Sequence, residues 1–409
     1  MNEVFIPVQI EEPLLEFRNS VSMRSPRRGI LKVGAYDFGR IPEVRVVLLV
    51  HHKLETDFSR FWTLVEKGET QSGYKGFAST FGSKLTVVKR SVYDATENLV
   101  QWVGQQSFNL PPFAVVIICF PDSDIEKNYY ELKKAVMLQG PRAQLMFAST
   151  LERPSPGFIA VGIATAIYAK AGGTPWRLLD PLAPGGLFLG LGFAMGQNSN
   201  SIYFGVVEVY DRFGKLIEAH AQTYDLPFSQ KSEGLFVPAG NLSQILGGIK
   251  ERLKPLFIIV HKSGQFHEEE LSVFDSLSLP LGLIHLEFAN PYRLYDTEDQ
   301  KLAAFRGLLA RDIENEYRGI LLTTGNINDT YIQRHAMGTP RSIEVNVVRN
   351  TVNFTLAQYS EQVLKLTKLD WNTLATAVRK PITVGYAQAA AGFRSSGYDR
   401  TFYDIRDLI

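Results

Sequence analysis

The sequence predicts an α/β protein with two domains, a parallel sheet flanked by helices followed by a mixed sheet. From about residue 43 to 180, short apolar runs rich in β-branched residues alternate with longer amphipathic stretches, which is typical of parallel strands joined by crossover helices. From about residue 186, strand-like segments follow one another across short turns. The length of 409 residues exceeds what one hydrophobic core usually serves, which favours two domains.

The first domain is expected to form a doubly wound sheet. Candidate strands span 44–51, 85–89, 113–120 and 144–148, and candidate helices span 55–67, 93–105, 126–138 and 158–171. Ligands of such sheets bind beyond the carboxyl ends of the strands. The run Pro121-Asp122-Ser123-Asp124 directly follows the most apolar strand, so a site is expected there. Residues 1–42 look irregular and are expected to pack back across the domain interface.

The second domain is expected to begin near residues 181–186, in a stretch rich in Pro and Gly. Its candidate strands span 187–194, 201–210, 215–223, 256–261, 281–288, 342–348 and 382–386, with an antiparallel ribbon around 305–324. Its candidate helices span 241–252, 267–276 and 355–368. Three antiparallel strands that lead into a mixed sheet with helices on both faces form a ribonuclease-H-like plan.

Composition narrows the class of protein. Hydrophobic residues make up 45% and charged residues 21%, which are globular values, and no apolar run approaches the roughly 20 residues that span a bilayer. The N-terminus lacks the order of a secretory signal, so a cytoplasmic protein is expected. Cys119 is the single cysteine and lies in an apolar run, which excludes an internal disulfide and favours a core position.

The net charge of +1 argues against a basic coat, so any nucleic-acid site must be local. Basic and aromatic residues do gather near the C-terminal end of the chain. This mixture fits either an ordinary solvated surface or a groove for a polyanion. The residues are Arg379, Lys380, Tyr386, Phe393, Arg394, Tyr398, Arg400, Phe402, Tyr403 and Arg406.

Three motifs carry a resemblance to a known family. They are Lys170-Ala-Gly-Gly-Thr-Pro-Trp176, Gly338-Thr339-Pro340 ahead of the strand 342–348, and Asp370-Trp371 followed by Pro381-Ile-Thr-Val-Gly-Tyr386. In this order the chain resembles the MID and PIWI halves of Argonautes, particularly the short prokaryotic branch that lacks N and PAZ domains. The resemblance covers nearly all of the chain beyond residue 43. It implies a Rossmann-like MID domain over 43–180 and a ribonuclease-H-like PIWI domain over 181–409.

The resemblance implies a pocket for the 5′ phosphate of a guide strand. Such a phosphate needs fixed donors and a cation or a helix N-terminus. Tyr129 and Lys133 lie four residues apart on one helix face, Gln144 begins the next strand, and Lys170 closes the fourth helix. By resemblance, Tyr129 stacks on the first guide base and contacts the phosphate, with Tyr130 as the alternative. By the same resemblance, Lys133, Gln144 and Lys170 bind the phosphate directly. Without the family, each would be an ordinary surface, strand-edge or helix-end residue.

A divalent cation, Mg²⁺, is part of the implied pocket. In relatives it bridges guide phosphates and the C-terminal carboxylate, which makes Ile409 the candidate metal ligand through its carboxylate. The apolar end of the chain suits a terminus that is tucked inward. Some relatives add an amide side chain where this sequence has Ala166, and a hard cation can complete its shell with water and phosphate oxygens.

The resemblance also implies that the chain does not cut nucleic acid. Active PIWI domains hold two Mg²⁺ ions with several carboxylates. The corresponding positions here carry Gly192, Ser263 and Gln388. The acids Asp211, Glu268 and Asp399 lie outside the expected strand ends, and the run Glu268-Glu269-Glu270 suits the first turn of a helix.

The function implied by the resemblance is guided recognition without cleavage. A small guide, RNA by resemblance, would pair with a complementary DNA target and switch on an associated effector subunit in prokaryotic defence against plasmids or phage. Such effectors carry an APAZ region with a TIR, sirtuin-like or nuclease domain, or are membrane-acting toxins. Two alternatives remain open: an active guided nuclease that uses displaced acids, and a scaffold protein with a vestigial pocket.

Overall fold

The computed structural model describes residues 4–94, 98–108, 110, 114–196, 199–225, 234–295, 297, 304–327, 339–375, 378–400 and 405–407. Within these ranges the chain forms two compact units. The smaller unit holds residues 15–177 and 370–375, and the larger unit holds residues 4–14, 178–369 and 378–407. The segment 1–42 is therefore shared, because its first described residues belong to the larger unit and the rest to the smaller one.

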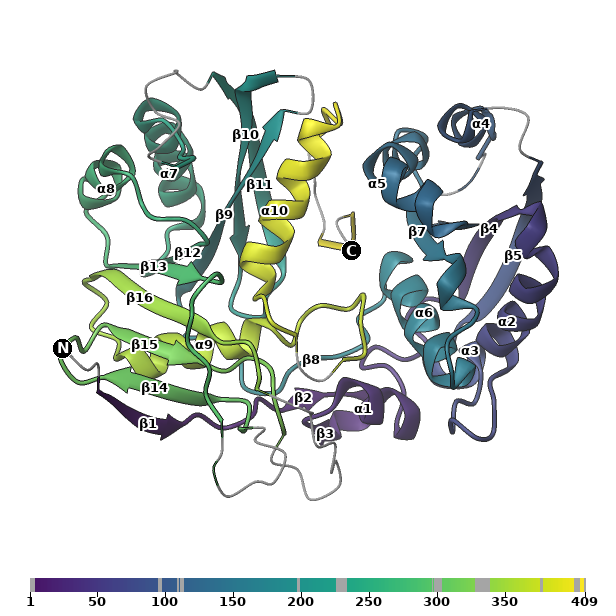
Figure 1. The fold of residues 1–409 in the computed structure, drawn as a ribbon, viewed down its shortest axis with the longest axis horizontal. Helices are drawn as coiled ribbons and strands as arrows, with labels where there is room; N and C mark the ends of the chain where they lie inside the picture. Colours follow the sequence, from purple (N-terminus) through teal and green to yellow (C-terminus); the bar gives the residue numbers. More distant parts are fainter. Residues whose placement is uncertain are drawn as a thin grey trace. The chain divides into compact units, whose positions relative to one another are not determined.

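The smaller unit is built on a four-stranded parallel sheet in the order β5-β4-β6-β7 (Figure 1). Its strands are β4 (Glu43–His51), β5 (Lys84–Tyr93), β6 (Val115–Phe120) and β7 (Arg142–Phe147). Its helices are α1 (Pro26–Lys32), α2 (Glu55–Lys67), α3 (Phe77–Phe81), α4 (Leu99–Gln105), α5 (Asp122–Met137) and α6 (Pro156–Lys170). A short hairpin pairs β2 (Leu15–Glu16) with β3 (Ser22–Met23). The doubly wound arrangement that the sequence predicts is confirmed.

The local sequence explains these elements. Every side chain of β6 is buried, including Cys119, as expected for a central strand that is covered on both faces. The helix expected from residue 93 begins later, because β5 continues to Tyr93 and Asn98 forms the N-cap of α4. The side chain of Asn98 accepts hydrogen bonds from the backbone N–H groups of Val100 and Gln101.

The larger unit is built on a nine-stranded mixed sheet in the order β1-β14-β15-β16-β13-β12-β9-β10-β11. Its strands are β1 (Phe5–Gln9), β9 (Gly186–Gly196), β10 (Ser199–Tyr210), β11 (Leu216–Asp225), β12 (Phe257–Lys262), β13 (Leu281–Glu287), β14 (Leu308–Asp312), β15 (Arg318–Leu321) and β16 (Ile343–Asn350). Strands β9, β10 and β11 are antiparallel, whereas β12 runs parallel to both β9 and β13. This topology confirms the ribonuclease-H-like plan.

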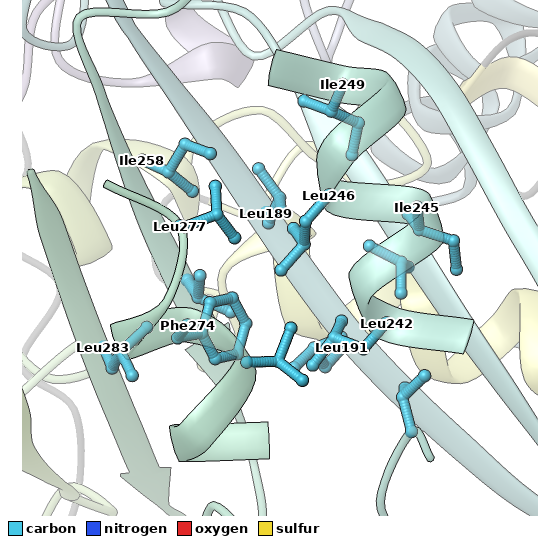
Figure 2. Close-up of a cluster of buried hydrophobic side chains, with 14 of the residues drawn as sticks. Leu189, Leu191, Leu242, Ile245, Leu246, Ile249, Ile258, Phe274, Leu277 and Leu283 are labelled. Carbon is cyan, nitrogen blue, oxygen red and sulfur yellow. The ribbon is translucent and has the colours of Figure 1, made fainter. Parts of the chain in front are cut away.

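Helices cover both faces of this sheet. On one face, α7 (Ala239–Leu253) and α8 (Glu268–Asp275) pack on the strands through a core that includes Leu189, Leu246 and Phe274 (Figure 2). On the other face, α10 (Ile382–Ser395) lies along β9 and β10 (Figure 1). The remaining helix, α9 (Leu356–Leu366), contacts β14 and β15. No helix in the described ranges combines the length and apolarity that crossing a membrane requires.

One expected element is wrong: residues 382–386 begin helix α10 and do not form a strand. The β-branched run Ile382-Thr383-Val384 resembles a strand locally. Further along, residues 387–391 (Ala-Gln-Ala-Ala-Ala) are strong helix formers, and Pro381 stands at the N-cap position. The helix is buried against the sheet, so tertiary packing decides the conformation.

Candidate functional site

The first candidate site gathers around α5 and the C-terminal end of α6. Tyr129 and Lys133 lie on one face of α5, and the Lys133 ammonium is 4.9 Å from the centre of the Tyr129 ring. Helix α5 bends at Asn128, directly before the tyrosine. The Lys133 side chain is buried, with 3% of the residue exposed. Lys133 is therefore not a solvent-facing lysine.

Lys170 is the last residue of α6 and is 1% exposed. Among the residues that the structure describes, its ammonium nitrogen has no hydrogen-bond partner. Burial holds the pKa of Lys170 well below its usual range, and the charges of Lys133 and Arg142 lower it further, while Asp370 opposes them. The structure thus brings Lys133 and Lys170 close enough for their charges to interact.

Arg142 is a member of this cluster that the sequence did not reveal. It begins β7, is 9% exposed, and donates a hydrogen bond of 2.5 Å to the backbone carbonyl of Lys170. The guanidinium therefore neutralises part of the exposed C-terminal dipole of α6. No local motif marks such an arginine, because the contact depends on the fold bringing β7 beside the end of α6.

Gln144 lies two residues further along β7 and is 8% exposed. Its amide nitrogen donates to the carbonyl of Leu145 at 3.0 Å, and its side-chain oxygen has no hydrogen-bond partner within the described ranges. The amide oxygen of Gln144 cannot donate a hydrogen bond to a phosphate. In this orientation it can bind a cation or accept a hydrogen bond. An amide flip would present the nitrogen in its place.

Tyr130, the alternative to Tyr129, packs edge-on against it, with ring centres 5.3 Å apart. Burial raises the pKa of Tyr130. Tyr129 is the one of the two whose ring lies beside the buried ammonium of Lys133. The geometry therefore favours Tyr129 as the aromatic member of the cluster. A site was also expected at residues 121–124, directly after β6. One of these residues, Asp122, accepts a hydrogen bond of 3.0 Å from the backbone N–H of Ser149 and so holds two loops of the fold together.

The motif that follows Lys170 ends helix α6 and binds it to the loop of Asp37. Gly172 has a φ of +104°, which favours glycine, and the next residue closes the helix with a 3.0 Å hydrogen bond to the carbonyl of Tyr168. The carboxylate of Asp37 accepts hydrogen bonds from the backbone of Thr174 at 2.9 Å and from the Tyr168 hydroxyl at 2.7 Å. The motif thereby fixes where the Lys170 side chain begins. Gly338 of the second motif lies outside the described residues.

Part of the expected cation site falls on described residues. Ile409, whose carboxylate is the expected ligand, lies outside the described residues. Ala166 is buried and supplies no donor. The unpartnered oxygen of Gln144 is a hard ligand of the kind that Mg²⁺ prefers, so this residue fits such an ion. Within the described ranges, no three His, Cys, Asp or Glu side chains are grouped to hold a metal.

The second candidate site lies where β9, β12 and α10 meet. A Cβ added to Gly192 would stand 2.1 Å from the carbonyl carbon of Ala387 and 2.5 Å from the nitrogen of Gln388. The Gln388 amide nitrogen donates to the Ser263 hydroxyl at 3.0 Å. The structure therefore brings together the three positions at which active relatives are expected to carry acids. Here they hold a glycine, a serine and a glutamine.

The charged group beside these three residues is a cation. The Lys380 ammonium donates to the side-chain oxygen of Gln388 at 2.8 Å. The acidic run 268–270 does form the first turn of α8, as expected, and His267 completes a capping box. Within that run, the buried carboxylate of Glu270 pairs with Lys262 at 2.6 Å, so it is committed to the fold.

The sequence also missed a buried carboxyl group, Glu208 on β10. It is fully buried, pairs across the sheet with Gly190, and accepts a hydrogen bond from the Tyr210 hydroxyl. Burial raises the pKa of Glu208 to about 8. In the same unit, burial lowers the pKa of His261 to about 3, and its ring nitrogen lies 3.0 Å from the Thr383 hydroxyl. Both groups are neutral at neutral pH, which suits an apolar layer.

Comparisons with known proteins agree with this fold. The family model of the Piwi domain matches residues 115–398. The Argonaute protein of Aquifex aeolicus is 21% identical over 324 residues, covering 76% of this chain and 42% of that protein. A structure of A. aeolicus Argonaute superposes with a TM-score of 0.68 at 14% identity, covering 97% of this chain and 54% of that one.

A further structure, Clostridium butyricum Argonaute bound to a guide DNA and a 19-mer target DNA, superposes with a TM-score of 0.72 at 17% identity. It covers 98% of this chain and 54% of that one. This chain thus spans about half the length of the relatives that it matches. Because the Piwi family model covers more than half of the chain, the chain belongs to the Piwi domain family.

Proposed function

We propose that this protein holds the 5′-phosphorylated end of a small guide strand in the pocket of Tyr129, Lys133, Arg142 and Lys170. The observation that carries the proposal is the buried ammonium of Lys170, which finds no hydrogen-bond partner in the described part of the chain and lies near the like charges of Lys133 and Arg142. Burying a cation without compensation is costly, and a bound phosphate dianion removes that cost. The ring of Tyr129 offers a surface on which the first base stacks.

In this proposal, the guide selects its target by base pairing. The protein reads the 5′ end and the backbone, and pairing reads the sequence. The resemblance favours an RNA guide and a DNA target. Among the relatives, C. butyricum Argonaute is bound to a guide DNA and a target DNA, so the sugar of each strand has to be measured for this chain.

The proposal includes a cation as part of the pocket. Gln144, through its unpartnered oxygen, and the terminal carboxylate of Ile409 would hold Mg²⁺. The ion would supply positive charge beside the phosphate. The chain's own contribution is to provide three buried cations and to keep water away from them.

We further propose that the protein does not cleave its target and acts through an associated effector subunit in cytoplasmic defence against plasmids or phage. Neutral side chains at the three expected acid positions support the first part. A protein that binds without cutting can still report pairing to a partner, by coupling between duplex binding and effector assembly. The effector is sought as a protein that copurifies, with an APAZ region fused to a TIR, sirtuin-like or nuclease domain, or as a membrane-acting toxin.

The deciding experiment compares one oligonucleotide with and without its 5′ phosphate. Wild-type protein should prefer the phosphorylated strand. Lys133→Ala combined with Lys170→Ala should lose on the order of 3–6 kcal/mol of affinity for it, since charged hydrogen bonds contribute about 1.5–3 kcal/mol each. The hydroxyl form should respond much less.

Lys127→Ala is the matched control, because Lys127 lies on the same helix and is exposed. It should leave the phosphate preference unchanged. Equal affinity of wild-type protein for both oligonucleotides would reject the pocket and leave the scaffold alternative. Metal-dependent cutting of a paired target would reject the non-cleaving part alone.

A further inference from the structure

The place where the three expected acid positions converge is built as a hydrogen-bonded chain that ends in a cation. The Lys380 ammonium donates to Gln388, and Gln388 in turn donates to Ser263. The amide oxygen of Gln388 thus accepts one hydrogen bond, and its nitrogen donates the other. Because its nitrogen is committed to the serine hydroxyl, its oxygen is fixed as the acceptor that positions the ammonium.

A second cation, Arg379, lies beside Lys380. Arg379 donates hydrogen bonds to the backbone carbonyls of Phe288 and Ser342, and its Nε has no hydrogen-bond partner among the described residues. The Phe288 ring lies 5.5 Å from both the Arg379 guanidinium and the Lys380 ammonium. The aromatic face supports the two charges without neutralising them.

The positive charges of Arg379 and Lys380 are only partly balanced by nearby negative charge. Burial lowers the pKa of Arg379, and the charges of Arg341 and Arg293 lower it further, while Glu287 opposes them. Burial also lowers the pKa of Lys380, followed by the charge of Arg379. Cations close enough to depress a neighbour's pKa favour a polyanion as the ligand.

We propose that Lys380, held by Gln388 and Ser263, binds one backbone phosphate of the paired nucleic acid directly, at the place where active relatives use carboxylate-held metal ions. The inference rests on the proposed function. An ammonium pairs with a phosphate oxygen, but it neither activates water nor stabilises a leaving oxygen as a pair of metal ions does. The same position therefore holds the strand without cutting it. Lys380 is the phosphate ligand, and Gln388 is a positioning residue.

The test replaces one phosphate of the target at a time with a neutral methylphosphonate and measures affinity for guide-loaded protein. With wild-type protein, one linkage should stand out with a loss of about ten- to a hundredfold, the value of a charged hydrogen bond. With Lys380→Met, affinity for the unmodified target should fall by a similar factor, and the same linkage should no longer stand out. The salt dependence of target affinity should weaken by about one phosphate contact.

Two variants make the result specific. Lys215→Met removes an exposed lysine of the same unit and should leave both the scan and the salt dependence unchanged. Gln388→Leu keeps the Lys380 ammonium but removes the hydrogen bond that positions it. The loss of affinity caused by a methylphosphonate at that linkage should then be smaller than in wild-type protein, and neighbouring linkages should show part of it. Thermal unfolding of each variant confirms that it folds.

The inference is overturned if the scan of Lys380→Met is superimposable on that of wild-type protein. It is equally overturned if the loss caused by Lys380→Met and the loss caused by the methylphosphonate multiply at every linkage, because the two changes then act independently. The proposed function has a separate readout, the preference of wild-type protein for a 5′-phosphorylated strand. Loss of that preference with the Lys380 result intact would reject the 5′ pocket and leave the backbone site standing.

Discussion

The backbone of Ala387 occupies the space that a side chain on Gly192 would need, since a Cβ there would stand 2.1 Å from its carbonyl carbon. Gly190 makes the same kind of contact, because a Cβ added to it would stand 1.8 Å from the Thr383 carbonyl oxygen. The two glycines form a floor on β9 on which α10 packs directly. A glycine at position 192 is thus required by the packing of the unit.

Gly192→Asp should destabilise the protein and should not create a nuclease. Forcing atoms into a packed core typically costs about 1–3 kcal/mol, and an unpaired buried charge adds to that cost. Denaturant unfolding would measure the loss. Gly240→Asp is the matched control, because a Cβ there meets nothing within 4 Å and the residue begins a helix. A Gly192→Asp protein as stable as wild type would contradict this account.

Arg142→Met should weaken binding of a 5′-phosphorylated strand and also loosen the end of α6. The arginine contributes positive charge to the pocket and holds the carbonyl of Lys170. Losing the second contact should move the Lys170 ammonium, so affinity should fall by more than one charge explains. Arg142→Lys should restore the charge but not the geometry of that contact. Recovery of full affinity in Arg142→Lys would show that only the charge matters.

The sequence predicted most of the larger architecture, because alternating apolar runs report burial directly. It also identified three positions, Gly192, Ser263 and Gln388, that the fold brings together. It failed where the decisive contact is distant in sequence. The run 382–386 favours a strand locally, whereas the alanines that follow it and the packing of α10 on the glycines of β9 favour a helix.

The pocket shows the same division. The family resemblance pointed to Lys133 and Lys170, and the structure brings the two close enough for their charges to interact. That they bind a phosphate stays a prediction. Arg142 could not be predicted, since its role depends on the position of a helix end that it does not adjoin in sequence. The orientation of the Gln144 amide is likewise a property of its neighbour's carbonyl, which no sequence pattern reports.

Affinity for a 5′-phosphorylated strand should depend on pH through Lys170. Its pKa in the free protein is held well below the ordinary value of 10.5, and a bound phosphate raises it. Affinity should therefore be highest below the free-state pKa and should fall as pH rises through the interval up to the pKa of the complex. Titrating a DNA oligonucleotide between pH 7 and about 10 measures this, above the second pKa of the phosphate near 6.

Two controls isolate that effect. The same strand with a 5′ hydroxyl should show little of the pH dependence. Lys170→Met should flatten it and should also stabilise the free protein, since a buried lysine with a lowered pKa costs stability that is recovered only as pH rises. A pH profile that is identical in wild-type protein and in Lys170→Met would assign the titration to another group.

Glu208→Gln should remove a pH dependence of folding. The pKa of Glu208 is raised from 4.5 to about 8 by burial, so the folded protein keeps a proton that the unfolded chain releases. In wild-type protein, this residue should lower the free energy of unfolding as pH rises from about 4.5 to 8. The amide is close in shape to the neutral acid and has no proton to release. Urea unfolding at about pH 5 and about pH 8 should give a smaller difference for Glu208→Gln than for wild type, and an unchanged difference would mean that the carboxyl ionises readily in the fold.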